Sequence, residues 1–188
     1  MIQNFIIMYM KTIGLDLSIN STGVCINNNG KYKYYIICSK MTKKMKEFDN
    51  KYIKLIEYNK QSVEGEYSEK ELIKTNNIYN IIGELKSIIK KEKPDECRIE
   101  GISYGSVGSA ALVDLSGLNF MVRQMLIDLK IPFKIISPTS NKKFAVGNGQ
   151  AEKDIIIDSW LRLQPHLKGI DIKVDDIADA YFLSNYTE

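Results

Sequence analysis

The chain has 188 residues, of which 44% are hydrophobic and 26% are charged, values that are typical of a folded globular protein. This length suffices for one sizeable core, so we expect a single domain over residues 1–188. The three cysteines are odd in number and follow no CxxC spacing, which argues against a disulfide framework and a zinc cluster. The net charge of +3 permits nucleic-acid binding without requiring it.

The apolar opening Met1–Met10 lacks a basic leader and a small-residue cleavage site, and it is too short to span a bilayer. We therefore expect no targeting signal and no membrane partner, and the unpaired cysteines favour a reducing cytoplasm. The bias toward Ile, Lys, Asn and Tyr suggests an A/T-rich genome, such as that of a phage or another virus acting in the host cytoplasm.

Alternation of apolar and polar residues predicts three consecutive antiparallel strands near the start of the chain. The first, Lys11–Ser18, places Asp16 on its polar face. The other two, Val24–Asn27 and Tyr32–Cys38, flank an Asn-Gly step that suits a tight hairpin turn.

The lysine-rich residues 40–60 are irregular apart from a strand-like run at Tyr52–Tyr58, and we expect a connection there. From Ser68 to Lys91 apolar residues recur at helical spacing until Pro94 ends the pattern, which predicts a long amphipathic helix. Its apolar stripe consists of Leu72, Ile78, Ile81, Ile82, Leu85, Ile88 and Ile89.

Helices and strands alternate in the second half of the chain. A short strand at Cys97–Ile102 carries Glu100 on its polar face, and the small residues of Gly105–Ala111 follow it. The further predicted elements are a helix at Leu112–Leu129, a strand at Phe133–Ile136 and helices at Ala151–Leu163 and Val174–Asn185. This order favours an α/β fold with a mixed sheet.

Four carboxylates occupy positions that call for a partner. Asp16 lies between two leucines of a strand, where an unpaired carboxylate costs on the order of several kcal/mol. Glu100 repeats this situation, and Asp176 and Asp179 share one face of the last helix. Turn capping would explain Asp16 alone and the helix dipole would explain Asp175, but neither explains an aspartate between two alanines beyond the first turn.

Converging carboxylates without histidine or cysteine nearby suit magnesium or manganese rather than zinc. Two such ions about 4 Å apart can activate a water and stabilise the leaving oxygen in phosphodiester cleavage. The residues alone therefore favour metal-dependent hydrolysis.

Four short motifs follow one another along most of the chain. They are IGLDLSINSTGV at Ile13–Val24, RIEG at Arg98–Gly101, VGNGQAEK at Val146–Lys153 and DDIADA at Asp175–Ala180. Each motif alone is weak, but their order and spacing resemble the RuvC family of Holliday junction resolvases, which are RNase H-like nucleases. The resemblance implies an RNase H-like mixed five-stranded sheet, with three antiparallel strands and then parallel strands, flanked by helices.

The resemblance also implies which residues form the site. The metal ligands carried over by position are Asp16, Glu100, Asp176 and Asp179, for two Mg²⁺ ions with Mn²⁺ as a substitute, and Asp175 is the alternative to Asp176. The family's two active-site lysines correspond to Lys153 and to either Lys142 or Lys143. The residues expected to contact DNA are Lys142, Lys143, Lys153, Tyr104, Gly105, Ser106 and Ser109.

The implied function is a homodimeric endonuclease that makes paired symmetric nicks in four-way DNA junctions during recombination, repair or DNA packaging. The helix Leu112–Leu129 is expected either to pair the subunits or to pack on its own sheet. Residues 40–93 match the family poorly, as an insertion would, and their KMTKKMK run is either a DNA-contacting arm or a solvated loop. Ser103, followed by Tyr104, stands where the family often has an aromatic wedge, which leaves junction selectivity open.

Three other functions fit parts of the sequence. The nearest is a relaxed nuclease for forks, flaps and Y-junctions. A junction-binding module without catalysis would not need the four acids together with Lys153. An ATP-handling protein of the actin and sugar-kinase type would share the GLDLSINSTG turn, but the chain is too short for its second subdomain. No small-molecule cofactor is expected, and metal-dependent cutting distinguishes the candidates.

Overall fold

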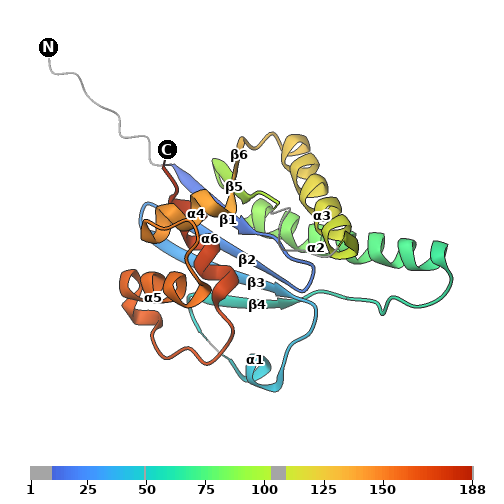
Figure 1. Ribbon diagram of the computed structural model, residues 1–188, viewed down its shortest axis with the longest axis horizontal. Helices are drawn as coiled ribbons and strands as arrows, with labels where there is room; N and C mark the ends of the chain where they lie inside the picture. The colour runs from blue at the N-terminus through green and yellow to red at the C-terminus, as the bar shows by residue number, and fades with distance from the viewer. Residues whose placement is uncertain (1–9, 49, 103–108, 188) are drawn as a thin grey trace, which may run out of the picture.

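The computed structural model describes residues 10–48, 50–102 and 109–187, which are built around a six-stranded mixed sheet (Figure 1). The strands are β1 (Lys11–Asp16), β2 (Ser21–Asn28), β3 (Lys31–Cys38), β4 (Ile53–Glu57), β5 (Glu96–Glu100) and β6 (Phe133–Ile136). Their spatial order is β4-β3-β2-β1-β5-β6. β2 runs antiparallel to β1 and β3, and every other pair is parallel. The predicted α/β class with a mixed sheet is confirmed.

The sheet has one strand more than the five predicted. The strand-like run at Tyr52–Tyr58 contains β4, which lies parallel beside β3 at one edge of the sheet. Its sequence IKLIE is short and includes two charged residues, as is common for edge strands. The possible strand at Tyr52–Tyr58 is therefore confirmed, whereas the connection expected in the rest of residues 40–60 is wrong for the short helix α1 (Lys43–Glu47).

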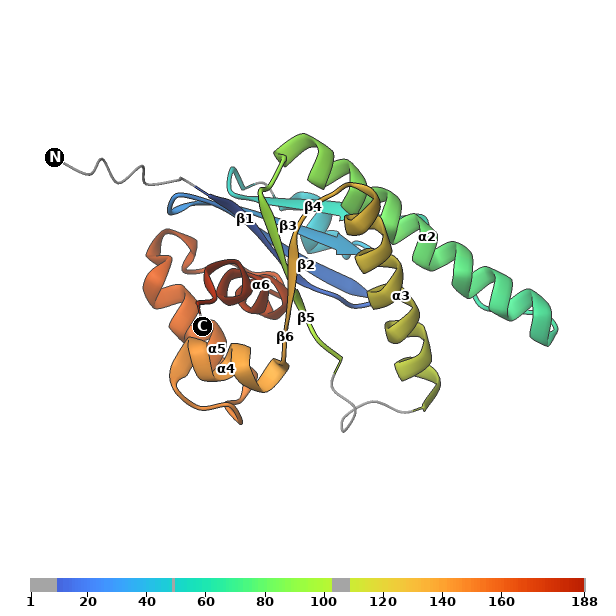
Figure 2. The same cartoon turned by 90° about the horizontal axis from the view of Figure 1, so that it is seen from above.

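Helices cover both faces of the sheet (Figure 2). The remaining helices are α2 (Tyr67–Glu92), α3 (Ser109–Asp128), α4 (Pro138–Val146), α5 (Lys153–Leu163) and α6 (Asp175–Asn185), with a short 3-10 helix η1 (Pro165–Leu167). α2 and α3 form one core with the sheet, and α5 and α6 form the other. α4 was not predicted, because most of its nine residues are polar and give no clear apolar stripe.

The predicted apolar stripe of α2 is buried only in the later part of the helix. Ile78, Ile81 and Leu85 lie in the core, whereas the side chain of Leu72 is 61% exposed. The first turns of α2 project beyond the sheet, as Figure 1 shows, so Leu72 has no partner layer to cover it.

α3 has both a buried and an exposed apolar side. Leu118, Val122 and Leu126 are buried in the core shared with α2. Val113 and Phe120 are more than half exposed, as is Ile127. By length and composition alone, α3 is the one helix of the described residues that could cross a membrane. This is weak evidence for a membrane span, because the core helices of soluble proteins pass the same test.

Two glycines let α6 lie directly on the sheet. A Cβ atom on Gly14 of β1 would stand 2.1 Å from the carbonyl oxygen of Ala180, and one on Gly23 of β2 would stand 2.1 Å from that of Asp176. Side chains at these positions would push the helix outward. The close approach fixes the height of the first turns of α6 above the strand that carries Asp16.

We therefore expect Gly14→Ala to lower the free energy of unfolding by about 3 kcal/mol, because the new methyl group overlaps the backbone of α6. Gly83→Ala in α2 is the matched control, since a Cβ atom there meets nothing within 4 Å and alanine favours helix by about 1 kcal/mol. Urea unfolding of both variants measures the difference. Equal stability of the two variants would contradict the role assigned to Gly14.

Candidate functional site: a carboxylate-lined cavity

The four predicted acids come together at one end of the sheet. Asp16 is the last residue of β1 and Glu100 the last residue of β5, and these parallel strands are neighbours, so their carboxyl ends meet at the same edge. Asp176 and Asp179 lie in the first turns of α6, which packs on β1 and β2. Three separate elements therefore supply one acidic cluster.

These acids face a cavity of about 400 Å³ between α3 and α6. Lysines stand in the same wall, which makes the lining mixed in charge. The polar and charged residues that line the cavity are Asp16, Ser18, Glu100, Asn119, Lys142, Lys153, Lys173, Asp176 and Asp179. All four predicted ligands and two of the three lysines named from the sequence are therefore in one place.

Burial and mutual repulsion disfavour ionisation of the acids. Burial raises the pKa of Asp16 well above its usual range, and the charges of Glu100 and the two α6 aspartates raise it further. Burial raises the pKa of Glu100 to about 7 and that of Asp179 to about 6. The pKa of Asp176 is also raised by burial, although a hydrogen bond from Ser21 acts in the opposite direction. A nearby cation would relieve this repulsion.

The structure places the two residues of each open choice differently. Asp176 lines the cavity, whereas Asp175 is buried beside it and accepts a 2.7 Å hydrogen bond from Lys153. Lys142 lines the cavity and its Nζ donates to the carbonyl oxygen of Ala151 at 2.8 Å, whereas Lys143 is exposed and outside the lining. Asp176 and Lys142 are therefore the members of each pair that line the cavity.

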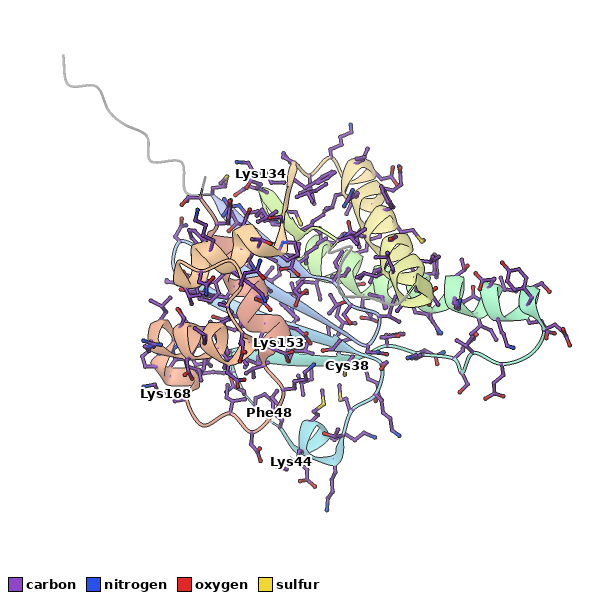
Figure 3. All side chains as sticks on the ribbon, viewed as in Figure 1. Cys38, Lys44, Phe48, Lys134, Lys153 and Lys168 are labelled. Carbon is purple, nitrogen blue, oxygen red and sulfur yellow. The ribbon has the colours of Figure 1, made fainter. Side chains whose placement is uncertain are left out.

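Asp175 holds two lysines in place. Its Oδ2 lies 2.7 Å from Nζ of Lys153 and 3.2 Å from Nζ of Lys173. Burial alone would raise the pKa of Asp175, but the hydrogen bonds and charges of the two lysines lower it overall. The hydrogen bond with Asp175 also raises the pKa of Lys153, so this lysine stays charged beside the cavity. Lys153 is labelled in Figure 3.

Three further residues that shape the site were not predicted from the sequence. Ser21 donates a hydrogen bond to Oδ2 of Asp176, and Lys173 is a third lysine in the lining. Asn141 is fully buried, donates to the carbonyl oxygen of Asp179 at 3.3 Å, and lowers the pKa of Glu100 through a hydrogen bond. Ser21 lies within the first motif and Lys173 lies near the last, so both could have been noticed, whereas nothing in the sequence marks Asn141.

Part of the predicted DNA-contacting segment lies outside the described residues, namely Tyr104, Gly105 and Ser106. Ser109 is described as the first residue of α3.

The donor set fits a divalent cation by its chemistry. Oxygen ligands of hard, charged type are those that Mg²⁺ and Mn²⁺ prefer, and the raised pKa values mark a surplus of negative charge. Within the described part of the chain, no three acidic, histidine or cysteine side chains are already arranged to hold an ion.

The fold and this site define an RNase H-like architecture with a carboxylate-lined cavity at the sheet end. No protein-family model and no curated protein matches the sequence. Among solved structures, Thermus thermophilus RuvC is similar, with 14% identity, a TM-score of 0.57 and coverage of 93% of this chain and 91% of that one. The predicted resemblance to RuvC is thereby confirmed at the level of the fold.

Two structures with DNA are similar as well. T. thermophilus RuvC in complex with Holliday junction substrate has 9% identity and a TM-score of 0.62, with coverage of 94% of this chain and 90% of that one. Fowlpox virus resolvase in complex with Holliday junction DNA has 14% identity and a TM-score of 0.50, with coverage of 94% and 95% respectively.

The raised pKa values predict that stability without divalent ions decreases as pH rises. The folded chain keeps protons on Glu100 and Asp179 that the unfolded chain loses near pH 4, so the loss of stability falls between about pH 4 and pH 7. We expect the free energy of unfolding to be roughly 2 kcal/mol lower at pH 8 than at pH 5 in chelator. Asp16→Asn should shrink this difference, because it removes a repelling charge.

Urea unfolding at both pH values measures the effect. Asp158→Asn on the exposed side of α5 is the control and should leave the difference unchanged. A stability that rises from pH 5 to pH 8 would show that the acids are not repelling one another.

Proposed function

We propose that this protein is a divalent-metal-dependent endonuclease that resolves four-way DNA junctions. The observation that carries the proposal is the cavity at the ends of β1 and β5, where four carboxylates and two of the predicted lysines converge. Because the buried acids repel one another when ionised, bound cations would stabilise their charged forms. The lysines beside them would attract an anionic substrate. A phosphodiester with bound metal ions meets both requirements.

The comparisons support the choice of substrate. Two structures with this fold, T. thermophilus RuvC and fowlpox virus resolvase, are complexes with Holliday junction DNA. At such low identity the likeness reaches only the fold, so the substrate is carried to this chain as a proposal.

We assign each site residue a role that is consistent with its position. Asp16, Glu100, Asp176 and Asp179 would hold two Mg²⁺ ions, with Mn²⁺ as a substitute. When bound, these ions supply activation of a water and stabilisation of the leaving oxygen. Lys153, held by Asp175, presents a fixed positive charge to the scissile phosphate, and Lys142 adds a second one from α4.

Paired nicking requires two copies of the site, and we propose that the chain acts as a homodimer. The outer side of α3 offers an apolar surface for this, since Val113, Phe120 and Ile127 are 58–65% exposed. Large apolar side chains grouped on one helix face commonly mark a contact between proteins. Two-fold pairing would direct the two cavities to opposing strands of a junction.

Nicking of labelled DNA tests the proposal. With Mg²⁺ we expect paired nicks in four-way junctions, and Asp16→Asn or Asp179→Asn should slow nicking about 1,000-fold or more, because each removes a metal ligand. Asp158→Asn should nick like the native protein, since this aspartate is exposed and outside the cavity.

Other outcomes identify the rival functions. Equal cutting of forks, flaps and Y-junctions would indicate the relaxed nuclease. Junction binding without cutting in Mg²⁺ or Mn²⁺ would overturn the enzymatic proposal and leave a binding module.

The neighbouring lysines of α4 give a matched pair for the second test. Lys142→Ala should reduce the single-turnover nicking rate about 100-fold, because Lys142 lines the cavity. Lys143→Ala should change the rate less than about threefold, because this side chain is exposed and outside the lining. The reverse order of effects would reassign the site lysine to Lys143.

A further inference from the structure

A second charged cavity lies at the β4 edge of the sheet. It has a volume of about 440 Å³ and opens between β4, α1 and the segment that joins them. Five lysines line it, together with the aromatic side chains of Tyr35, Phe48 and Tyr52. We call this cavity the lysine pocket. Its lysines are Lys33 of β3, Lys46 of α1, Lys51, Lys54 of β4 and Lys91 of α2.

Most of the positive charge of the lysine pocket is not neutralised. Lys33 pairs with Glu92 at 2.8 Å, and Lys51 lies 4.8 Å from the ring centre of Tyr52. Lys46, Lys54 and Lys91 form no ion pair with any acid of the described residues, and all three are exposed. Several like charges around one hollow repel one another, and a polyanion placed there removes the repulsion.

Packing connects the lysine pocket to the catalytic cavity. Lys44 of α1 forms a 2.5 Å ion pair with Asp171, which is two residues before Lys173 in the cavity wall. α1 therefore lies beside the segment that borders the catalytic cavity, and Figure 3 labels Lys153, Phe48 and Lys44 along this side of the molecule. Measured across the sheet, β4 is three strand spacings from β1, or about 15 Å. This is less than the width of a DNA duplex, so one DNA molecule could reach both strands.

We propose that the lysine pocket binds the phosphate backbone of one duplex arm of the DNA whose cleaved strand lies in the catalytic cavity. The inference rests on the proposed function, because it takes the same DNA as its ligand. The pocket is lined by lysines and aromatic side chains but by few hydrogen-bonding groups suited to base edges, so we expect it to bind DNA of any sequence. Residues 40–93, which match the RuvC pattern poorly, thus supply a DNA contact of their own.

Salt-dependent binding of a labelled four-way junction in Ca²⁺ or chelator tests this assignment. The triple variant Lys46→Gln, Lys54→Gln, Lys91→Gln should bind about tenfold more weakly at low salt, and the slope of log affinity against log salt should fall by about 3. The control variant Lys70→Gln, Lys86→Gln, Lys168→Gln removes the same charge from exposed lysines outside both cavities and should bind like the native protein. Arginine at positions 46, 54 and 91 should retain the native slope.

The outcomes separate the two proposals. Suppose that the native protein binds and nicks junctions, and that the lysine pocket variant binds with the same affinity and the same salt slope as the native protein. The pocket assignment then fails and the proposed function stands. Equal weakening in both triple variants would show a general charge effect and would also overturn the pocket. If the native protein binds no branched DNA, both proposals fail. Unfolding midpoints equal to that of the native protein confirm that the variants are folded.

Discussion

The site depends on the contact between α6 and the two strands beneath it. Gly14 and Gly23 leave no side chain between helix and sheet, so the helix backbone rests on β1 and β2. This contact places Asp176 and Asp179 of the helix next to Asp16 of the strand. A helix held farther away by side chains would leave the same acids apart, and the cavity would lose its concentrated charge.

Such a concentration of charge opposes folding and has to be offset by neighbouring groups. Four acids face one cavity, and burial and repulsion raise the pKa of each. Asp175 acts in the opposite sense, because it is buried but pairs with Lys153 and Lys173 and so keeps two positive charges at the rim. The cavity therefore combines acids that favour a divalent ion with lysines that favour the phosphate such ions would act on.

Sequence patterns predicted the parts of the fold whose burial is regular. Strand alternation around Asp16 and the helical spacing of Ile78 to Ile89 follow directly from which faces are covered. They could not fix whether β4 is a strand, because an edge strand with an open side carries charged residues like a loop. The choices between Asp175 and Asp176, and between Lys142 and Lys143, needed coordinates, since adjacent residues of a helix point about 100° apart but have the same local sequence.

The lysines at the β4 edge have a competing explanation, since charged side chains on an edge strand prevent pairing with other chains. That explanation suffices for Lys54, which is part of β4 itself. It does not account for Lys46 of α1 or Lys91 of α2, because these lysines lie on helices and are not part of the edge strand. Both nevertheless line the same cavity. A bound polyanion needs lysines from several elements to converge on one cavity, and here they come from a strand and two helices. Protection of a strand edge needs no such convergence.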